Sequence, residues 1–433
     1  MPDALKLDLS EKLYAKAVEL IPGGSQTMSK RPQGYAPGAF PIYAERAKGC
    51  RVWDVDGNEY IDYLMALGPI VLGYCYPAVD HAIVEQLKKG VVYGLLHPLE
   101  VKAAQLITET VPCAEMVRFL KGGAETTTAA ARIARAYTGR ELILNCGYRG
   151  WADQWTAQQT TPNARGVPEC LRNTVRSFPY NDLPALEAIL RETADQVALV
   201  FLDPVSATEP DAGYLGGVRE LCDRYGVLLA FDEIVTGFRL APGGAQEAYG
   251  VTPDLACFAK GVANGMPLGV VCGTREIMQT AADLLISVTY GGECLSLAAV
   301  CACLEEYRKG RVHPHLWRQG EQLVHGFAES GRRHGVPFDC TGLAPMACPR
   351  FTHPNPEFNA DAWSFFLQET AKRGVLIRRG GLLFVTFSHQ DEDIEHTLSV
   401  VDESLALLAD AVRSGNLKDR LHTKPIEESF RRF

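Results

Sequence analysis

The sequence predicts an α/β fold in which a large domain with a mostly parallel central sheet is joined to a small α+β domain. After about residue 63, apolar runs of strand length occur, and helical stretches separate several of them. The first five residues of these runs are MVRFL, ELILN, VALVF, GVLLA, LACFA and PLGVV. Strands that are apolar on both faces and alternate with helices are typical of a parallel sheet covered on both sides. Beyond about residue 316, longer helices surround a few short strands, which predicts the smaller domain.

Three segments outside this alternation carry local signals of their own. A helix is expected near residues 9–20, where apolar residues share one face before the stop signal IPGG. The stretch CRVWDVDGNEYIDYL predicts a β-hairpin, because Asp56 and Gly57 supply the positive φ of a tight turn. A helical stripe of apolar residues that ends at Gly415 predicts a long C-terminal helix.

These signals divide the chain into three segments. Residues 1–63 are expected to contribute to the small domain, residues 64–315 to form the large domain, and residues 316–433 to complete the small domain. The hairpin is expected to join the C-terminal part.

Composition narrows the classes of partner. The net charge of −9 over 433 residues argues against a nucleic-acid binder, which would carry a basic stripe. The N-terminal stretch lacks the apolar core of a signal peptide, and the longest apolar runs are too short to span a membrane. Thirteen scattered cysteines predict buried, reduced thiols in a cytoplasmic protein. No metal site is expected, because no Cys-x-x-Cys or His-Glu-x-x-His pattern occurs.

Unusual residues follow three of the expected strands, at the ends where open α/β sheets bind ligands. Gly122 and Gly123 precede a helix whose N-terminus suits a phosphate or carboxylate, although glycines also suit a plain strand-to-helix turn. Asp232 follows an apolar run, where a carboxylate is costly unless a cation meets it; Glu233 is expected to be the more solvated of the two acids. Lys260 ends another apolar run. Burial favours its neutral, nucleophilic form, whereas most lysines reach solvent.

An anion cradle, a buried carboxylate and a buried amine at the ends of one sheet suit pyridoxal phosphate (PLP). The turn would hold its phosphate, and the carboxylate would keep its ring nitrogen protonated. The lysine would bind its aldehyde as a Schiff base and then move a proton. A dinucleotide oxidoreductase is the other α/β option, but no Gly-x-Gly-x-x-Gly follows a strand.

The chain resembles the class III aminotransferases of the fold-type I PLP enzymes and is most similar to their glutamate-1-semialdehyde aminomutase-like branch. The resemblance is carried by LIPGGSQ, VWDVDGNEYIDY, ARAYTGR, FDEIVTGFR, PDLACFAKG and FSHQDEDIEHTL. It implies an enzyme that moves an amino group from an amino acid donor to a keto or aldehyde acceptor through a Lys260 Schiff base. The alternatives are an intramolecular aminomutase, an amino acid racemase, or a non-catalytic PLP-binding protein.

The resemblance also implies roles for individual residues. Lys260 would be the Schiff-base lysine and Asp232 the partner of the pyridinium nitrogen. The other implied cofactor contacts are Gly122, Gly123 and Ala124 at the phosphate, Tyr148 and Ile234 on the two ring faces, and Thr289, which reaches the phosphate from the second subunit of a homodimer. Substrate contacts are expected at Lys30, Arg31, Arg149 and Arg378.

The chain departs from the pattern of that branch near the expected site. Gly122 and Ala124 replace usual hydroxyl residues, so the phosphate would rest on backbone N–H groups, with Thr126 or Thr127 as candidate hydroxyl donors. Three further departures are Arg149 for a usual histidine, Asp203 for a usual glutamate and Glu293 for a usual asparagine. Because these charges are expected to line the substrate side, we predict net amino transfer to an acceptor other than glutamate semialdehyde.

Overall fold

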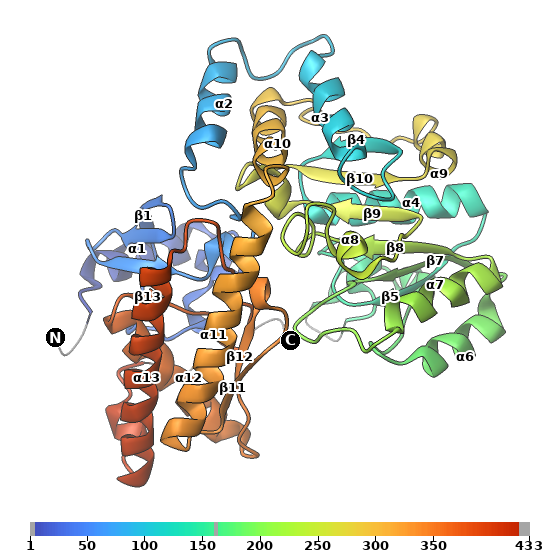
Figure 1. The fold of residues 1–433 in the computed structure, drawn as a ribbon. Helices are drawn as coiled ribbons and strands as arrows, with labels where there is room; N and C mark the ends of the chain where they lie inside the picture. The colour runs from blue at the N-terminus through green and yellow to red at the C-terminus, as the bar shows by residue number, and fades with distance from the viewer. Residues whose placement is uncertain (1–4, 160–162, 424–433) are drawn as a thin grey trace. The chain divides into compact units, whose positions relative to one another are not determined.

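The structure is a computed structural model that describes residues 5–159 and 163–423 (Figure 1). Within these residues the chain forms two compact units. The first unit is drawn from segments 1–67, 71–76 and 314–433, and the second from segments 68–70 and 77–313. The division into segments 1–63, 64–315 and 316–433 stays a prediction.

The second unit is built on a seven-stranded, mostly parallel sheet, as the sequence predicts. Its strands, in spatial order, are β4 (Met116–Leu120), β10 (Gly269–Gly273), β9 (Leu255–Phe258), β8 (Leu228–Asp232), β7 (Val197–Leu202), β5 (Leu142–Cys146) and β6 (Val175–Ser177). Neighbouring strands from β9 to β6 pair in parallel, whereas β10 runs antiparallel to both β4 and β9.

Helices cover both faces of this sheet (Figure 1). The helices of the unit are α2 (Pro77–Leu87), α3 (Pro98–Thr108), α4 (Gly123–Thr138), α5 (Asp153–Thr156), α6 (Leu183–Thr193), α7 (Tyr214–Tyr225), α8 (Ala245–Tyr249), α9 (Arg275–Gln279) and α10 (Cys294–Tyr307). Strand β7 shows why its run is apolar throughout. Ala198 and Phe201 pack in the core that contains α4, and Val200 and Leu202 pack in the core that contains α6 and α7.

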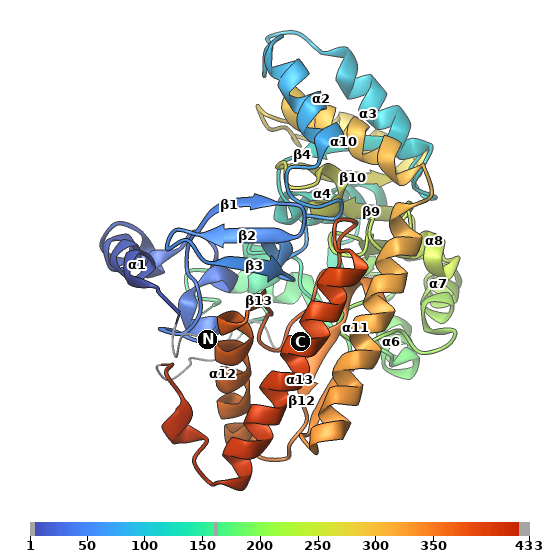
Figure 2. The same cartoon turned by 60° about the vertical axis from the view of Figure 1, so that its left-hand side comes forward.

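The first unit combines two small sheets with helices. One sheet has the order β1 (Ala44–Lys48), β2 (Arg51–Asp54), β3 (Glu59–Asp62) and β13 (Val375–Leu376), and the other pairs β11 (Phe338–Thr341) with β12 (Cys348–Phe351). The helices are α1 (Asp8–Leu20), α11 (Val312–His334), α12 (Pro356–Lys372) and α13 (Asp391–Arg413), and α12 packs against α13 (Figure 2).

The expected hairpin forms and is joined by the C-terminal part. Strands β2 and β3 pair antiparallel, and Gly57 in their connection has a φ of +91°. Strand β13 adds to β3 in parallel, with Val375 opposite Ile61. The hairpin therefore shares a sheet with residues more than 300 positions away, as predicted.

Two sequence expectations concern the whole chain. All thirteen cysteines are free thiols, and only Cys75 and Cys170 are exposed. Among the described helices, none has both the length and the apolar composition that crossing a bilayer requires.

Candidate active site

Five strands of the large sheet bring their carboxyl ends to one edge. Because β10 is antiparallel to both of its neighbours, β4 runs in the same direction as β5, β7, β8 and β9. The chain leaves these strands at Lys121, Gly147, Asp203, Glu233 and Ala259 respectively. The glycine turn, Asp232 and Lys260, expected from separate motifs, therefore lie on the same edge.

The glycine turn at the start of α4 leaves two backbone donors open. Glu125 Oε2 accepts from the N–H groups of Lys121 (2.7 Å) and Gly122 (3.1 Å). The N–H groups of Gly123 and Ala124 donate to no other group within the described part of the chain. Two open N–H groups at the N-terminus of a sixteen-residue helix suit an anion such as a phosphate.

Gly123 in this turn has no space for a side chain. A Cβ on Gly123 would lie 2.7 Å from Ile234 Cδ1, so the turn adjoins the residue expected against the cofactor ring. The hydroxyls of Thr126 and Thr127 do not serve the turn as donors to a phosphate. Both side chains are buried; Thr126 donates to the Gly123 carbonyl, and Thr127 donates to the Arg149 carbonyl at 2.6 Å. A phosphate at this turn would therefore rest on backbone N–H groups.

Asp232, the last residue of β8, holds a buried carboxylate. Its side chain is 5% exposed, Oδ1 accepts from the Ile234 N–H at 3.0 Å, and Oδ2 accepts from Arg149 Nη1 at 2.8 Å. Burial raises the pKa of Asp232, and the Arg149 charge opposes that rise. The cation that a buried carboxylate needs is the Arg149 guanidinium, which the sequence predicts at the substrate.

Arg149, expected at the substrate, faces the Asp203 and Asp232 carboxylates, and its contact with substrate stays a prediction. Its side chain is fully buried, and Nη1 also lies 2.5 Å from Asp203 Oδ1. Nη2 donates to the Cys146 carbonyl, and the guanidinium carbon lies 4.6 Å from the centre of the Phe201 ring. Arg149, Asp203 and Asp232 thus form one ion-pair cluster at the carboxyl ends of the adjacent strands β5, β7 and β8.

Lys260 begins a short 3₁₀ helix one residue after the end of β9, and it is half-buried rather than buried as the sequence predicted. Its φ of +44° lies in the left-handed region, which is strained for a residue with a side chain. The turn that holds it is anchored by Tyr307, whose hydroxyl donates to the Gly261 carbonyl at 2.6 Å. Such strain persists where the surrounding structure fixes the backbone, and it is frequent at functional sites.

The remaining cofactor candidates lie around this edge in different ways. Tyr148 is half-buried and directly precedes Arg149 after β5. Thr289 lies in an exposed turn before α10, and no hydrogen bond links its side chain to the glycine turn in the described residues. Its expected contact from a second subunit stays a prediction.

Two acidic residues have partners that the sequence did not reveal. Glu233, expected to be the more solvated acid, is fully buried because it caps α8: Oε2 accepts from the Ala245 N–H at 2.8 Å and Oε1 from the Gln246 N–H at 2.9 Å. Glu293 caps α10 and forms a 3.0 Å salt bridge with Lys121, the residue before the glycine turn. The partners of Glu233 lie 12 and 13 positions further on, and Lys121 lies 172 positions before Glu293, so no local pattern signals either pairing.

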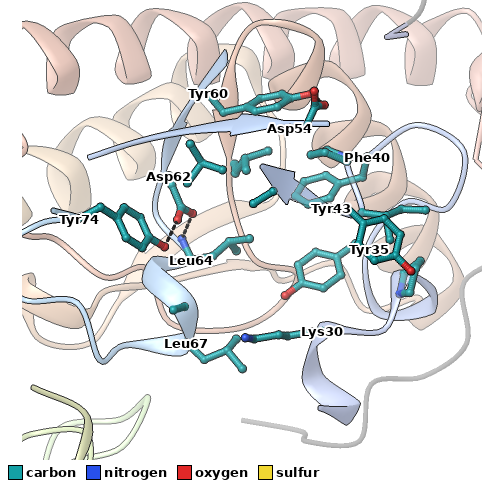
Figure 3. Close-up of a pocket in the computed structure, with 17 residues that line it drawn as sticks. Lys30, Tyr35, Phe40, Tyr43, Asp54, Tyr60, Asp62, Leu64, Leu67 and Tyr74 are labelled. Carbon is teal, nitrogen blue, oxygen red and sulfur yellow. Dashed lines mark hydrogen bonds between the residues drawn. The ribbon is translucent and has the colours of Figure 1, made fainter. Parts of the chain in front are cut away.

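The other three substrate candidates, Lys30, Arg31 and Arg378, belong to the first unit. Lys30 lines a cavity of about 330 Å³ together with aromatic side chains that include Tyr35 and Tyr43 (Figure 3). Burial raises the pKa of the Tyr35 hydroxyl, and the positive charge of Arg378 opposes that rise. Their contact with substrate stays a prediction.

The fold and the strand-edge site define the architecture of a fold-type I PLP-dependent transferase. The family model Aminotransferase class-III matches residues 34–405, and the chain belongs to this family.

Similar proteins carry names of more than one activity. The glutamate-1-semialdehyde 2,1-aminomutase of Syntrophobacter fumaroxidans is 37% identical over 417 residues, covering 90% of this chain and 96% of that protein. The 3-aminobutyryl-CoA aminotransferase of Cloacimonas acidaminovorans is 35% identical over 414 residues, covering 94% and 99%. The structure of the PLP internal aldimine form of the FumI protein from Sphingopyxis sp. MTA144 superposes with a TM-score of 0.88 at 27% identity, covering 96% of this chain and 98% of that one.

Proposed function

We propose that this class III aminotransferase uses PLP to move an amino group from an amino acid donor to a keto or aldehyde acceptor. The observation that carries the proposal is the buried Asp232 carboxylate, which ends a strand at the sheet edge shared by Lys260 and the open N–H groups of Gly123 and Ala124. An anion cradle, a carboxylate and an amine at one edge match the three polar parts of the cofactor.

The residues of the edge fit the cofactor, and each would have a separate task. PLP, when bound, supplies an electrophilic aldehyde and a ring that withdraws electrons from the substrate. Backbone N–H groups of the glycine turn would hold its phosphate, and Asp232 would hold the proton on its ring nitrogen. Tyr148 and Ile234 would pack on the ring faces. Lys260 would bind the aldehyde carbon and carry the proton that leaves the substrate Cα.

An intramolecular aminomutase is the second candidate, and the 37% identity to a protein of that name favours it. Net transfer is predicted from the sequence because Arg149, Asp203 and Glu293 are expected to line the substrate side. In the structure Arg149 pairs with both Asp203 and Asp232, and Glu293 pairs with Lys121, so all three charges have partners within the chain. Net transfer therefore rests on the family and on the aminotransferase relative, and a direct test is required.

The test follows the nitrogen atom. The purified, PLP-loaded protein is incubated with a nitrogen-15-labelled amino acid donor and a panel of keto and aldehyde acceptors. For a transferase, the label moves to a second carbon skeleton, and one keto product forms for each amine delivered. If the label stays on the skeleton that brought it, shifted by one carbon or racemised, the mutase or racemase takes the place of the transferase. If no substrate changes the absorbance of the bound cofactor, the protein is a non-catalytic PLP binder.

A homodimer with shared active sites is part of the proposal. Large apolar side chains are exposed around the start of α3 and the turn before α10: Leu95 (85%), Leu96 (89%), Val101 (72%) and Tyr290 (59%). A Cβ on Gly292 would lie 3.0 Å from the Glu100 carboxyl carbon, so the turn and the start of α3 are adjacent. Exposed apolar side chains gathered beside Thr289 support a protein interface there. The eleven buried, free thiols support a cytoplasmic location.

A further inference from the structure

Arg149 and Asp203 form an ion pair that leaves little space for other residues. Arg149 Nη1 lies 2.5 Å from Asp203 Oδ1, and the two side chains follow neighbouring strands β5 and β7. A Cβ on Gly147 would lie 2.1 Å from Asp203 Oδ2, and Gly147 has a φ of +108°. Only glycine suits both the conformation and the space, so the local backbone is built to admit this pair.

The pair is in direct contact with Asp232. The same Nη1 that binds Asp203 lies 2.8 Å from Asp232 Oδ2. One buried positive charge is therefore shared by two carboxylates, and the cluster carries a net charge of −1 when all three groups are ionised. Neighbouring thiols do not alter this sum, because burial raises the pKa of Cys146 to about 12 and that of Cys257 above its usual range.

The net charge of this cluster determines the charge that a ligand beside Asp232 meets. Were Asp203 neutral, Arg149 alone would balance Asp232 and the cluster would carry no net charge. Were both Arg149 and Asp203 neutral, Asp232 would again supply −1 by itself. In a buried site, a difference of one charge strongly changes the affinity for a proton on an adjacent group.

We propose that Asp203 acts through Arg149 to preserve the negative charge that Asp232 presents to the ring nitrogen of bound PLP. The inference rests on the proposed function, since it requires PLP to bind with its ring nitrogen at Asp232. Asp203 is then a positioning residue. Its charge controls ring protonation without contact between its carboxylate and the ring.

The experiment measures the ring proton directly. Wild type, Asp203→Asn, and the double variant Arg149→Gln with Asp203→Asn are loaded with PLP labelled with nitrogen-15 at the ring nitrogen. Its NMR shift reports the protonated fraction, and titration reports the dissociation constant of PLP. Asp203→Asn should lower the proton affinity of the ring nitrogen by about tenfold, which is one pKa unit. It should also raise the dissociation constant of PLP by about tenfold. The double variant should restore both, because it returns the cluster to −1.

Two controls separate charge from structure. Asp203→Glu keeps the charge and should keep the ring protonated. Asp223→Asn removes the same charge from an Arg219 ion pair on α7, where the acid is 66% exposed, and should leave the ring shift unchanged. Near-ultraviolet circular dichroism checks that each variant is folded. Arg149→Met with Asp203→Asn replaces the double variant if the latter does not fold.

The outcomes distinguish this inference from the proposed function. An unchanged ring shift in Asp203→Asn overturns the inference, as does a shift that the neutral double variant fails to restore in folded protein. If wild-type protein does not bind PLP at all, the proposed function fails, and the inference fails with it. If wild type binds PLP with an unprotonated ring nitrogen, the function stands and the inference alone is wrong.

Discussion

Lys121 and Glu293, 172 residues apart in sequence, form a 3.0 Å salt bridge between the glycine turn and the start of α10. Glu293 also accepts from the N–H groups of Leu295 (2.6 Å) and Ser296 (3.2 Å), which caps the helix. Burial alone would raise the pKa of Glu293, but the hydrogen bonds from Ser296 and Lys121 outweigh it and lower the pKa. One carboxylate therefore orders the helix end and restrains the turn expected to hold phosphate.

Replacing Glu293 by glutamine should destabilise the protein and loosen that turn. The Lys121 and Glu293 side chains are 19% and 11% exposed, so the change leaves a mostly buried lysine without an opposite charge and replaces two carboxylate acceptors at the helix end by one amide oxygen. We expect a loss of about 2 kcal/mol in the free energy of unfolding, measured by urea denaturation of the apoprotein. Glu305→Gln is the matched control, because its pair with Lys102 is more than half exposed and should contribute under about 1 kcal/mol. Equal losses of unfolding free energy in Glu293→Gln and Glu305→Gln would show that the Glu293 pair contributes no more than an exposed salt bridge.

Lys260 should be the residue that binds the cofactor aldehyde. After PLP is added, the protein should be yellow, and borohydride reduction followed by peptide mass spectrometry should find the cofactor on the peptide that contains Lys260. Lys260→Ala should still bind PLP through the phosphate and ring contacts, but it should not be labelled by borohydride. A protein that stays colourless with added PLP, or a label on another lysine, would refute the assignment.

Asp232→Asn should separate cofactor binding from catalysis. The amide keeps the shape of the buried carboxylate but removes the charge that holds the ring proton. We expect PLP still to bind, and the rate of Cα proton exchange of a bound amino acid, followed by deuterium incorporation, to fall about a hundredfold or more. Near-normal exchange in a variant that binds PLP would exclude Asp232 from this role.

The sequence could predict the residues whose signal is local. Asp232 ends an apolar run and is buried, as that run predicts. Lys260 ends another such run but is half-buried. Gly122 and Gly123 lie between a strand and a helix, where the sequence places the turn. The same local reasoning predicted the parallel sheet and the hairpin. A fully buried run such as β7 can belong only to an element that is covered on both faces.

The sequence did not predict the surroundings of a side chain where its partners come from another segment of the chain. No local pattern around Arg149 reveals its ion pairs with acids 54 and 83 positions away. The sequence predicts a more solvated Glu233, which was wrong because the N–H groups of Ala245 and Gln246 at the start of α8 donate to its buried carboxylate. In both cases the desolvation of a charge is compensated by groups that only the tertiary fold brings near, and no spacing in the sequence records them.

Acid should destabilise the apoprotein through His313. Its ring is buried, and because a carbonyl only accepts, Nε2 carries the proton donated to the Phe238 carbonyl at 3.1 Å. Burial lowers the pKa of His313 from 6.5 to about 4. As pH falls, the unfolded state therefore takes the proton first, and the stability present above pH 6.5 is lost progressively down to about pH 4.

The expected loss from His313 over that range is about 3 kcal/mol. It is measured as the difference in acid-side slope between wild type and His313→Gln, whose amide can still donate to Phe238. His325→Gln is the control, since the His325 side chain is 76% exposed. Identical slopes for wild type and His313→Gln would show that another group causes the acid sensitivity.

Mixing two inactive variants should restore activity if Thr289 serves the partner's cofactor. Thr289 is exposed beside the apolar side chains proposed as the dimer interface, so a second subunit could bring its hydroxyl to a phosphate there. In a heterodimer of Lys260→Ala and Thr289→Ala subunits, one site carries both lesions and the other carries neither. Random mixing should therefore recover about a quarter of wild-type activity, well above either variant alone. Subunit exchange is verified by native mass spectrometry. Confirmed exchange without recovery would place Thr289 in its own subunit's site or away from the cofactor.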